Sequence, residues 1–110
     1  MKKLVVALLM VVFSGSLYAG SAASGALSKI HFMSSGSVIV YTSGVRSGIP
    51  SCASTQPRRF AISATTDGGK VQLAGLLSAY TSGKNIVITG TGNCSAYGDT
   101  ETISYFYMAD

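Results

Sequence analysis

Residues 65–94 read TTDGGKVQLAGLLSAYTSGKNIVITGTGNC. Four large apolar residues in this stretch recur at positions i, i+3, i+4 and i+7, which places them on one face of a helix: Leu73, Leu76, Leu77 and Tyr80. Thr66 is suited to cap the start of this helix, and Gly83 followed by Lys84 is a usual way to end one. Residues 85–91 then alternate with a period of two, which predicts a β-strand. The stretch therefore predicts one helix packed on a small sheet.

Strand patterns lie on both sides of this stretch. Alternating or β-branched runs predict four more strands, at residues 29–33, 38–42, 58–63 and 101–108. Between the first two, Ser34-Ser35-Gly36 is either a tight turn or a bulge in one long bent strand. The order is three strands, the helix and two strands, which is the order of a five-stranded OB-fold barrel. A flat α+β meander fits the same order. The barrel is favoured because several strands are apolar on both faces.

The first 19 residues have the pattern of a secretory signal peptide. Lys2 and Lys3 form a charged start, residues 4–13 an apolar run, and residues 14–19 a small and polar exit. An apolar run of about ten residues is too short to span a bilayer, which needs roughly 20. The pattern predicts a bacterial protein that is secreted or periplasmic, without stable membrane insertion.

Cleavage is expected after Ala19, with Ala22 or Ala23 as alternatives. The predicted organisation is a signal peptide at residues 1–19, a flexible small-residue tail at residues 20–27, and a single domain at residues 28–110.

Cys52 and Cys94 are the only two cysteines. In an oxidising compartment two cysteines are expected to form a disulfide. The alternatives are a free nucleophilic cysteine or a two-thiolate metal site. A structural metal site needs four ligands, and His31 is the only histidine. We therefore predict a disulfide, no metal site and no cofactor.

The charge of the chain is modest once the leader is set aside. The eight Lys and Arg residues include Lys2 and Lys3, so six remain against four acidic residues, a net charge of +2. This small excess does not favour a polyanion-binding protein. Nucleic-acid binding also conflicts with export, so no nucleic-acid partner is expected.

The candidate ligand-binding residues are Arg58, Arg59, Tyr97, Asp99 and Glu101. In an extended strand Asp99 and Glu101 would point to the same side, roughly 6.5–7 Å apart. This spacing suits paired-carboxylate glycoside chemistry or a hard cation, although calcium needs more oxygen ligands than these two supply. The other interpretation is that Asp99 caps a turn and Glu101 either pairs with an arginine or protects a strand edge from pairing with another chain.

No nucleophile–base set accompanies these residues, so no catalytic residue and no enzyme activity are predicted. The Gly90-x-Gly92 pair is followed by a loop and not by a helix, which excludes the dinucleotide-binding motif. Tyr105 and Tyr107 in the last strand fit either an interface between subunits or ordinary packing.

Residues 57–106 also resemble a family of small secreted gammaproteobacterial proteins of uncharacterised function. Six motifs carry this resemblance: Arg59-Phe60-Ala61, Gly69-Lys70, Leu76-Leu77-x-Ala79-Tyr80, Ser82-Gly83-Lys84, Gly90-Thr91-Gly92-x-Cys94 and Gly98-Asp99-Thr100-Glu101-Thr102. More distantly, the plan is similar to the B subunit of subtilase cytotoxin.

That subunit is an OB-fold pentamer that binds sialylated glycans, so the resemblance implies an OB-fold, a non-catalytic toxin B-subunit-like role, a glycan ligand and assembly into a homo-oligomer. The chain lacks counterparts to the sugar-contacting loop of that subunit and has no Trp, so the glycan specificity is not carried over. The alternative is a periplasmic structural or partner-binding protein without a sugar site.

Overall fold

A computed structural model describes residues 19–109. It is mainly β, with seven strands and one α-helix: β1 Ser21–Gly25, β2 Leu27–Phe32, β3 Ser37–Thr42, β4 Arg46–Ser47, β5 Arg59–Ser63, α2 Asp67–Ser82, β6 Ile86–Gly90 and β7 Glu101–Met108, with a 3₁₀ turn, η1, at Ser51–Ala53. The predicted helix and all five predicted strands are present, with bounds shifted by at most two residues.

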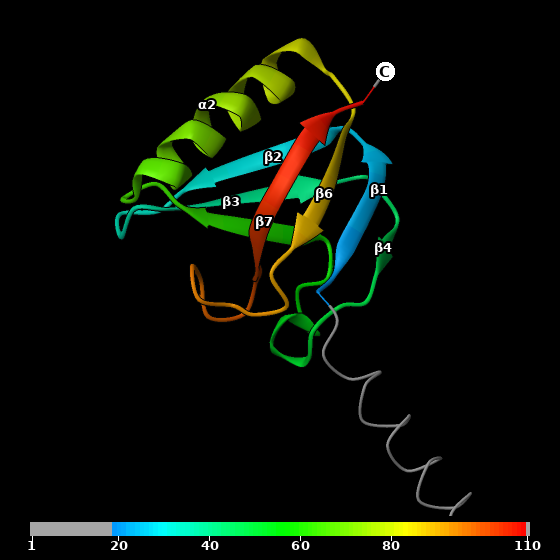
Figure 1. Ribbon diagram of the computed structural model, residues 1–110, viewed down its shortest axis with the longest axis vertical. Coiled ribbons are helices and arrows are strands. Elements are labelled where there is room, and N and C mark those ends of the chain that lie inside the picture. The colour runs from blue at the N-terminus through cyan, green and yellow to red at the C-terminus, as the bar shows by residue number, and fades with distance from the viewer. Residues whose placement is uncertain (1–18, 110) are drawn as a thin grey trace, which may run out of the picture.

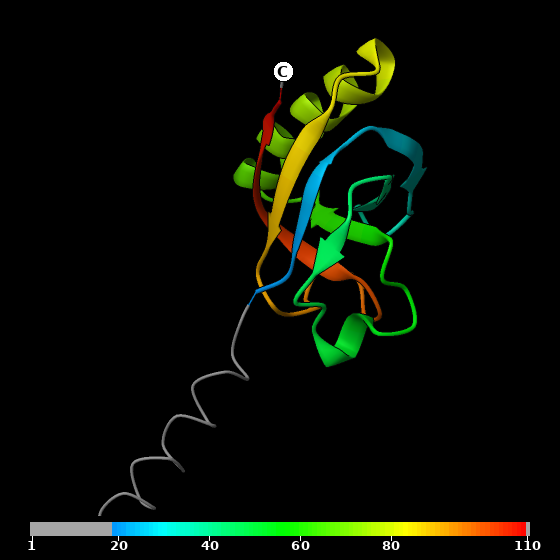
Figure 2. The ribbon, with the colours of Figure 1, turned by 90° about the vertical axis from the view of Figure 1, so that its right-hand side faces the viewer.

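The strands form one curled, half-barrel sheet in the order β2-β3-β5-β7-β6-β1-β4. All pairs are antiparallel except β5 with β7. Only Ala26 separates β1 from β2, yet β1 pairs with β6 while β2 pairs with β3. This bent segment therefore ties the two sides of the sheet together. The strands curl around a common interior, with α2 lying to one side (Figures 1 and 2).

The two additional strands correct the sequence-based organisation. Residues 20–27 were expected to be a flexible tail, but Ser21–Gly25 forms β1 and Leu27 begins β2. Small residues are required here because the chain segments approach closely: a Cβ on Gly25 would clash with the backbone of Gly44, and Ala22 is 1% exposed. The short β4 lies in the segment expected to be a loop and pairs with β1. Composition alone does not distinguish such a strand from a spacer.

A tight turn at Ser34-Ser35-Gly36 joins β2 and β3, and this excludes the alternative of a bulge in one long strand. The Met33 N–H donates to the Ser37 carbonyl at 2.8 Å, and Gly36 has a φ of 91°, in the left-handed region that glycine adopts readily. The β2–β3 pair is thus a hairpin and not one long strand.

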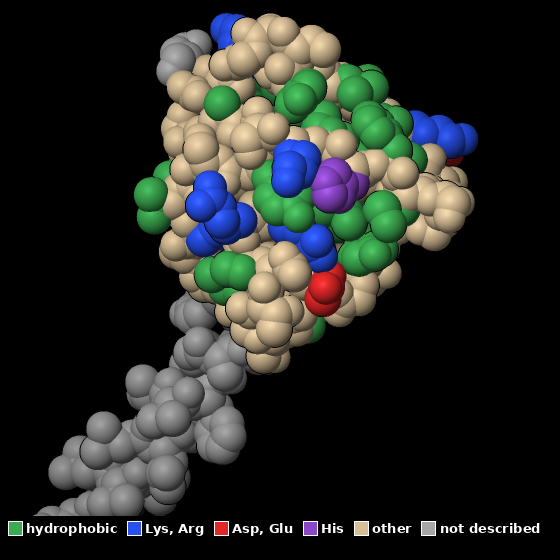
Figure 3. Space-filling model, turned by 180° about the vertical axis from the view of Figure 1, so that it is seen from behind, with side chains coloured by type: hydrophobic (Ala, Val, Ile, Leu, Met, Phe, Trp, Pro, Cys, Tyr) green, Lys and Arg blue, Asp and Glu red, His purple; other side chains and the backbone are tan. Residues whose placement is uncertain are grey.

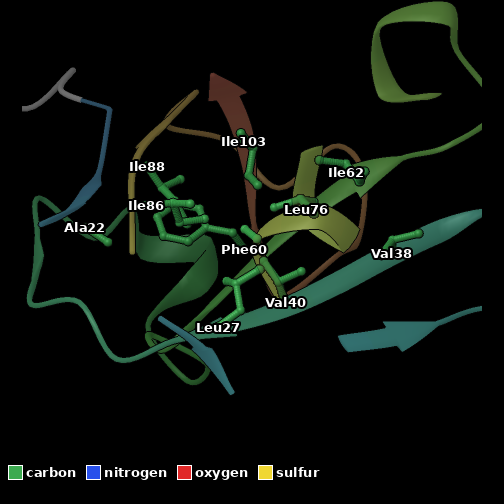
Figure 4. Packing of buried hydrophobic residues seen from close by; sticks show 11 residues of the cluster. Ala22, Leu27, Val38, Val40, Phe60, Ile62, Leu76, Ile86, Ile88 and Ile103 are labelled. Carbon is green, nitrogen blue, oxygen red and sulfur yellow. The ribbon is translucent and has the colours of Figure 1, made fainter. Parts of the chain in front are cut away.

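Side chains from both halves of the sheet and from α2 fill the interior (Figure 4). The fully buried members are mostly β-branched and aromatic residues, which are enriched in strands: Val40, Phe60, Ile62, Leu76, Ile86 and Ile88. The helix buries Leu76 and Ala79, while Leu77 and Tyr80, which were expected on the buried face, are 37% and 44% exposed. The sheet covers a narrower stripe of the helix than the pattern predicted. No helix within residues 19–109 has the length and apolar character needed to cross a bilayer.

Both predicted ends of α2 are confirmed. The Thr66 hydroxyl accepts a hydrogen bond from the Gly69 N–H at 2.9 Å, and Gly83 ends the helix in a left-handed conformation with a φ of 69°.

Replacing Thr66 by Ala should lower the free energy of unfolding by about 1 kcal/mol, because the first turn of α2 loses its side-chain acceptor. Urea denaturation of the oxidised protein measures this change. The matched control is Thr65→Ala, since the Thr65 hydroxyl bonds to Ser63 and takes no part in the cap. Equal losses in the two variants would contradict the capping role.

Candidate functional site

A row of three side chains crosses the outer face of β2, β3 and β5. Lys29 is paired with Tyr41, and Tyr41 with Arg59, so the three side chains lie next to one another on the same face of the sheet. The Lys29 Nζ lies 4.9 Å from the centroid of the Tyr41 ring, and the Arg59 Cζ lies 5.9 Å from it. Both distances are within the range of cation–π attraction. A tyrosine ring thus lies between two cations.

Further side chains extend this row into a patch. The His31 ring is 5.5 Å from that of Tyr41, and the Arg59 Cζ is 5.9 Å from the ring of Tyr97 in the loop before β7. Figure 3 shows basic side chains, the histidine and an acidic side chain gathered on one face of the molecule. We call this patch the Tyr41 face, and its members are Lys29, His31, Tyr41, Arg59, Tyr97 and Asp99.

The guanidinium of Arg59 is held in a fixed position. Its Nη2 lies 2.6 Å from Asp99 Oδ1, its Nε donates to the Thr100 hydroxyl at 3.0 Å, and its Nη1 donates to the Tyr41 hydroxyl at 3.4 Å. Burial acts to lower the pKa of Arg59, but the Tyr41 hydrogen bond and the Asp99 charge outweigh it and raise the pKa above its ordinary value. Arg59 is therefore a permanent and oriented positive charge on the Tyr41 face.

The loop that carries Tyr97 and Asp99 is anchored at two points. The predicted disulfide is confirmed: Cys52 in η1 is bonded to Cys94 in this loop. The Ser37 hydroxyl at the start of β3 donates to the Ala96 carbonyl at 2.7 Å. These links hold the loop against the strands of the Tyr41 face, so its side chains are positioned before any ligand arrives.

Glu101 lies elsewhere, in the interior. It is fully buried, and its Oε1 lies 2.5 Å from Nη2 of Arg46. Its Oε2 accepts hydrogen bonds from the backbone N–H groups of Gly20 at 2.8 Å and Gly92 at 2.9 Å. Burial lowers the pKa of Arg46, and the charge and hydrogen bond of Glu101 oppose this shift. We call this group the Glu101 cluster, with members Glu101, Arg46, Gly20 and Gly92.

The paired-carboxylate interpretation of Asp99 and Glu101 is therefore wrong. The Asp99 carboxylate is 46% exposed and pairs with the Arg59 side chain, which is 11% exposed, whereas Glu101 pairs with Arg46 in the interior. The extended geometry fails because Asp99 precedes the start of β7 at Glu101. The alternative, in which Glu101 pairs with an arginine, is the one observed, although with Arg46 and not with Arg58 or Arg59.

Of the five candidate residues, the structure brings three together: Arg59, Tyr97 and Asp99. Arg58 is exposed just before β5, and within residues 19–109 no hydrogen bond or ion pair joins it to the other four. Lys29, His31 and Tyr41 were not predicted as site residues. Alternation in residues 29–33 places Lys29 and His31 on one face, but the register that sets Tyr41 beside Lys29 cannot be obtained from either strand alone.

The glycines around Glu101 explain a motif that the sequence left unassigned. A Cβ on Gly90 would clash with the Glu101 carboxylate, and Gly92 has a φ of 83° as its N–H turns toward Oε2. The Gly90-x-Gly92 pair thus makes room for a buried carboxylate.

A separate hollow of about 360 Å³ lies between the first turn of α2 and the loop before β7. Apolar side chains, among them Ile62 and Ile103, line it together with hydroxyl and amide side chains, without a charged group: Ser63, Thr66, Gln72, Ser95 and Thr102. In the described part of the chain, no group of three or more His, Cys, Asp or Glu side chains is placed to hold a metal ion. Comparisons with protein-family models, curated proteins and solved structures find no match to this chain.

Proposed function

We propose that this chain is an exported, non-catalytic binding module with an OB-fold-like barrel, and that the Tyr41 face binds an acidic glycan. In this interpretation β1 and β2 are the two halves of one bent strand, and β3, β5, β6 and β7 are the other four. The helix between β5 and β6, the parallel β5–β7 pair and the antiparallel β1–β6 pair support this assignment. The two-residue β4 is then an addition at one edge.

The position of the Tyr41 face supports the proposed role. OB-folds bind oligosaccharides and oligonucleotides on the face of their second and third strands and on the loops that flank it. In the proposed assignment these strands are β3 and β5, which carry Tyr41 and Arg59. The flanking loops are the β2–β3 turn and the loop that carries Tyr97.

The observation that carries the ligand proposal is the Tyr41 ring between the cations of Lys29 and Arg59. An aromatic ring offers an apolar surface to the C–H groups of a sugar, and a guanidinium or an ammonium pairs with a carboxylate. Asp99 neutralises one of the two cations, so one positive charge is left for the ligand. The modest charge of the chain fits a single acidic group better than a polyanion.

Replacing Tyr41 by Ala should weaken the binding of the acidic oligosaccharide that the array selects at least tenfold, which corresponds to about 1.4 kcal/mol. Lys29→Ala should weaken the binding of the acidic oligosaccharide more than the binding of its neutral counterpart, because only the acidic one pairs with the Lys29 ammonium. The measurement is a binding titration of the oxidised mature protein, starting from an array of matched acidic and neutral glycans.

The matched control is Tyr105→Ala, which removes a tyrosine that is 56% exposed on β7. It should leave glycan binding unchanged. Failure of every acidic glycan on the array to bind would overturn the ligand proposal, and a loss with Tyr105→Ala but not with Tyr41→Ala would overturn the site.

A second candidate function is the binding of a protein partner, including a further copy of this chain, without a sugar site. It is favoured by Tyr105 and Tyr107, which are 56% and 55% exposed and lie opposite Thr89 and Val87 on the same face of the β6–β7 pair. Exposed tyrosines of this kind are enriched at interfaces. Light scattering of the mature protein measures its oligomeric state. A pentamer or other oligomer that Tyr105→Ala dissociates would support this role. A monomer at all concentrations would exclude self-association.

A further inference from the structure

The backbone nitrogen of Gly20 lies inside the Glu101 cluster. It donates to Glu101 Oε2 at 2.8 Å in a buried hydrogen bond, while the Gly20 carbonyl accepts from the Gly90 N–H at 2.7 Å. A side chain at position 20 has no room, because a Cβ would clash with the Glu101 carboxylate and lie 2.8 Å from Arg46 Nη2. Gly20 is thus held on both sides, with its nitrogen directed at a buried anion.

Gly20 also follows directly after Ala19, the expected cleavage position. The next residues, Ser21 and Ala22, pair with Thr89 and Ile88 of β6 and with Ser47 and Arg46 of β4. Cleavage after Ala22 or Ala23 would remove these pairs and the Gly20 hydrogen bond, whereas cleavage after Ala19 keeps all of β1.

We propose that hydrolysis of the Ala19–Gly20 peptide bond is a maturation step that places the new α-ammonium group of Gly20 on Glu101. The inference rests on the export that the proposed function assumes. A peptidase of the export machinery supplies the catalysis, and water is the co-reactant. The C–N bond breaks, and the oxygen of water bonds to the Ala19 carbonyl carbon. Both protons of the water are transferred to the Gly20 nitrogen, so that Ala19 ends in a carboxylate and Gly20 begins with an ammonium at neutral pH. No redox change takes place.

The two oxygens of Glu101 fit this role. Oε1 is already paired with Arg46, and Oε2 accepts from two backbone N–H groups, one of them that of Gly20. Converting that N–H from an amide to an ammonium makes the hydrogen bond charge-assisted and therefore stronger. The charged groups facing Gly20 are Glu101 from β7 and Arg46 from β4, and β6 contributes Gly90, which has no titratable side chain.

The sign of the pH dependence follows from this contact. An α-amino group has a pKa of about 7.7–8.0 in an unfolded chain. The direct hydrogen bond to the Glu101 carboxylate favours the charged form of the amine, whereas burial and the Arg46 guanidinium oppose it. In the proposed pair the carboxylate contact is the stronger effect, so the pKa of the amine is raised in the folded state. The added stability is therefore fully present below about pH 8 and is lost as the pH rises through the higher folded value.

The test uses two oxidised chains, one starting at Gly20 and one at Ala19, which moves the amine one residue outward and leaves an amide at Gly20. At pH 7.5 an amine-reactive ester should label the Gly20 amine at least tenfold more slowly than the Ala19 amine, since each unit of raised pKa removes about nine-tenths of the neutral amine. The Gly20 chain should also lose stability toward urea between about pH 8 and pH 10 relative to the Ala19 chain.

Mass spectrometry of the protein exported from the full chain completes the test, with Gly20 as the expected first residue. A different first residue, equal labelling rates or parallel pH profiles would each overturn the proposal. None of these measurements involves glycan binding. An array without binding therefore does not contradict the maturation step, and a negative result for the maturation step does not contradict glycan binding at the Tyr41 face.

Discussion

Replacing Glu101 by Gln is expected to lower the free energy of unfolding by about 3–5 kcal/mol, which is the usual cost of removing one partner from a buried ion pair. Both side chains of the Arg46–Glu101 pair are buried, with 7% and 0% exposure. The substitution leaves the Arg46 guanidinium in the interior without its carboxylate, and it weakens the acceptor for the N–H groups of Gly20 and Gly92. Urea denaturation of the oxidised mature protein at pH 7 measures the loss.

The chain provides a matched control for this prediction. Asp99→Asn also removes one carboxylate from an arginine pair, but the Asp99 side chain is 46% exposed and its charge is screened by solvent. The Arg59 side chain is only 11% exposed, yet it keeps its hydrogen bonds to the hydroxyls of Thr100 and Tyr41. Its loss should cost less than about 1 kcal/mol. Similar losses in the two variants would mean that burial does not set the strength of the Glu101 cluster.

Removing the disulfide is expected to lower the free energy of unfolding by about 4 kcal/mol. The bridge joins cysteines 42 positions apart, and the chain-entropy account assigns this magnitude to a loop of such length. A domain of this size buries only about 60–65% of the surface of its unfolded chain, so the loss is a large part of its stability. The measurement is urea denaturation of the Cys52→Ser, Cys94→Ser double variant beside the oxidised protein.

A reducing agent distinguishes the effect of losing the disulfide from the effect of replacing the two cysteine side chains by serine. It should lower the stability of the original protein toward that of the double variant and leave the double variant unchanged. An unchanged urea midpoint in the double variant would contradict the prediction. Because the bridge holds the loop that carries Tyr97 and Asp99, the double variant should also bind the acidic glycan more weakly at temperatures where it remains folded.

The elements that the sequence predicts well are those decided by local chemistry. Helix α2 begins after Thr66 and ends before Gly83 because both caps depend on neighbouring residues, and β7 is predicted with its observed bounds because β-branched and aromatic residues are frequent in it. Its alternation does not continue along the strand, because the register with β6 shifts between Ile103 and Tyr105, and Ile103 is buried while Tyr105 is exposed. The missed strand β1 is decided by distant residues: its small side chains are needed only because β6 and Gly44 lie against it. The exposure of Leu77 and Tyr80 is likewise set by how much of α2 the sheet covers.

In the candidate site, too, the features set by neighbouring residues are predictable and those set by distant residues are not. The choice of Arg59, Tyr97 and Asp99 is supported by a shared location, but their partner Tyr41 comes from β3, and its place beside Lys29 and Arg59 depends on register. The Glu101 cluster could not be assigned because Arg46 lies 55 residues away in the sequence. Asp99 and Glu101 look equivalent when they are read as neighbours, and only the sheet reveals that one is at the surface and the other inside.

The pairing of β1 has a consequence for the order of folding. The first strand of the domain finds its main partner, β6, only at residues 86–90, and β6 in turn pairs with the last strand. A chain that crosses a membrane from its amino end delivers β1 long before these partners emerge. The sheet therefore cannot close until nearly the entire polypeptide is present, and such long-range pairings make closure intrinsically slow. The order of the strands thus delays closure of the sheet until the last strand is present, which would suit the export that we propose.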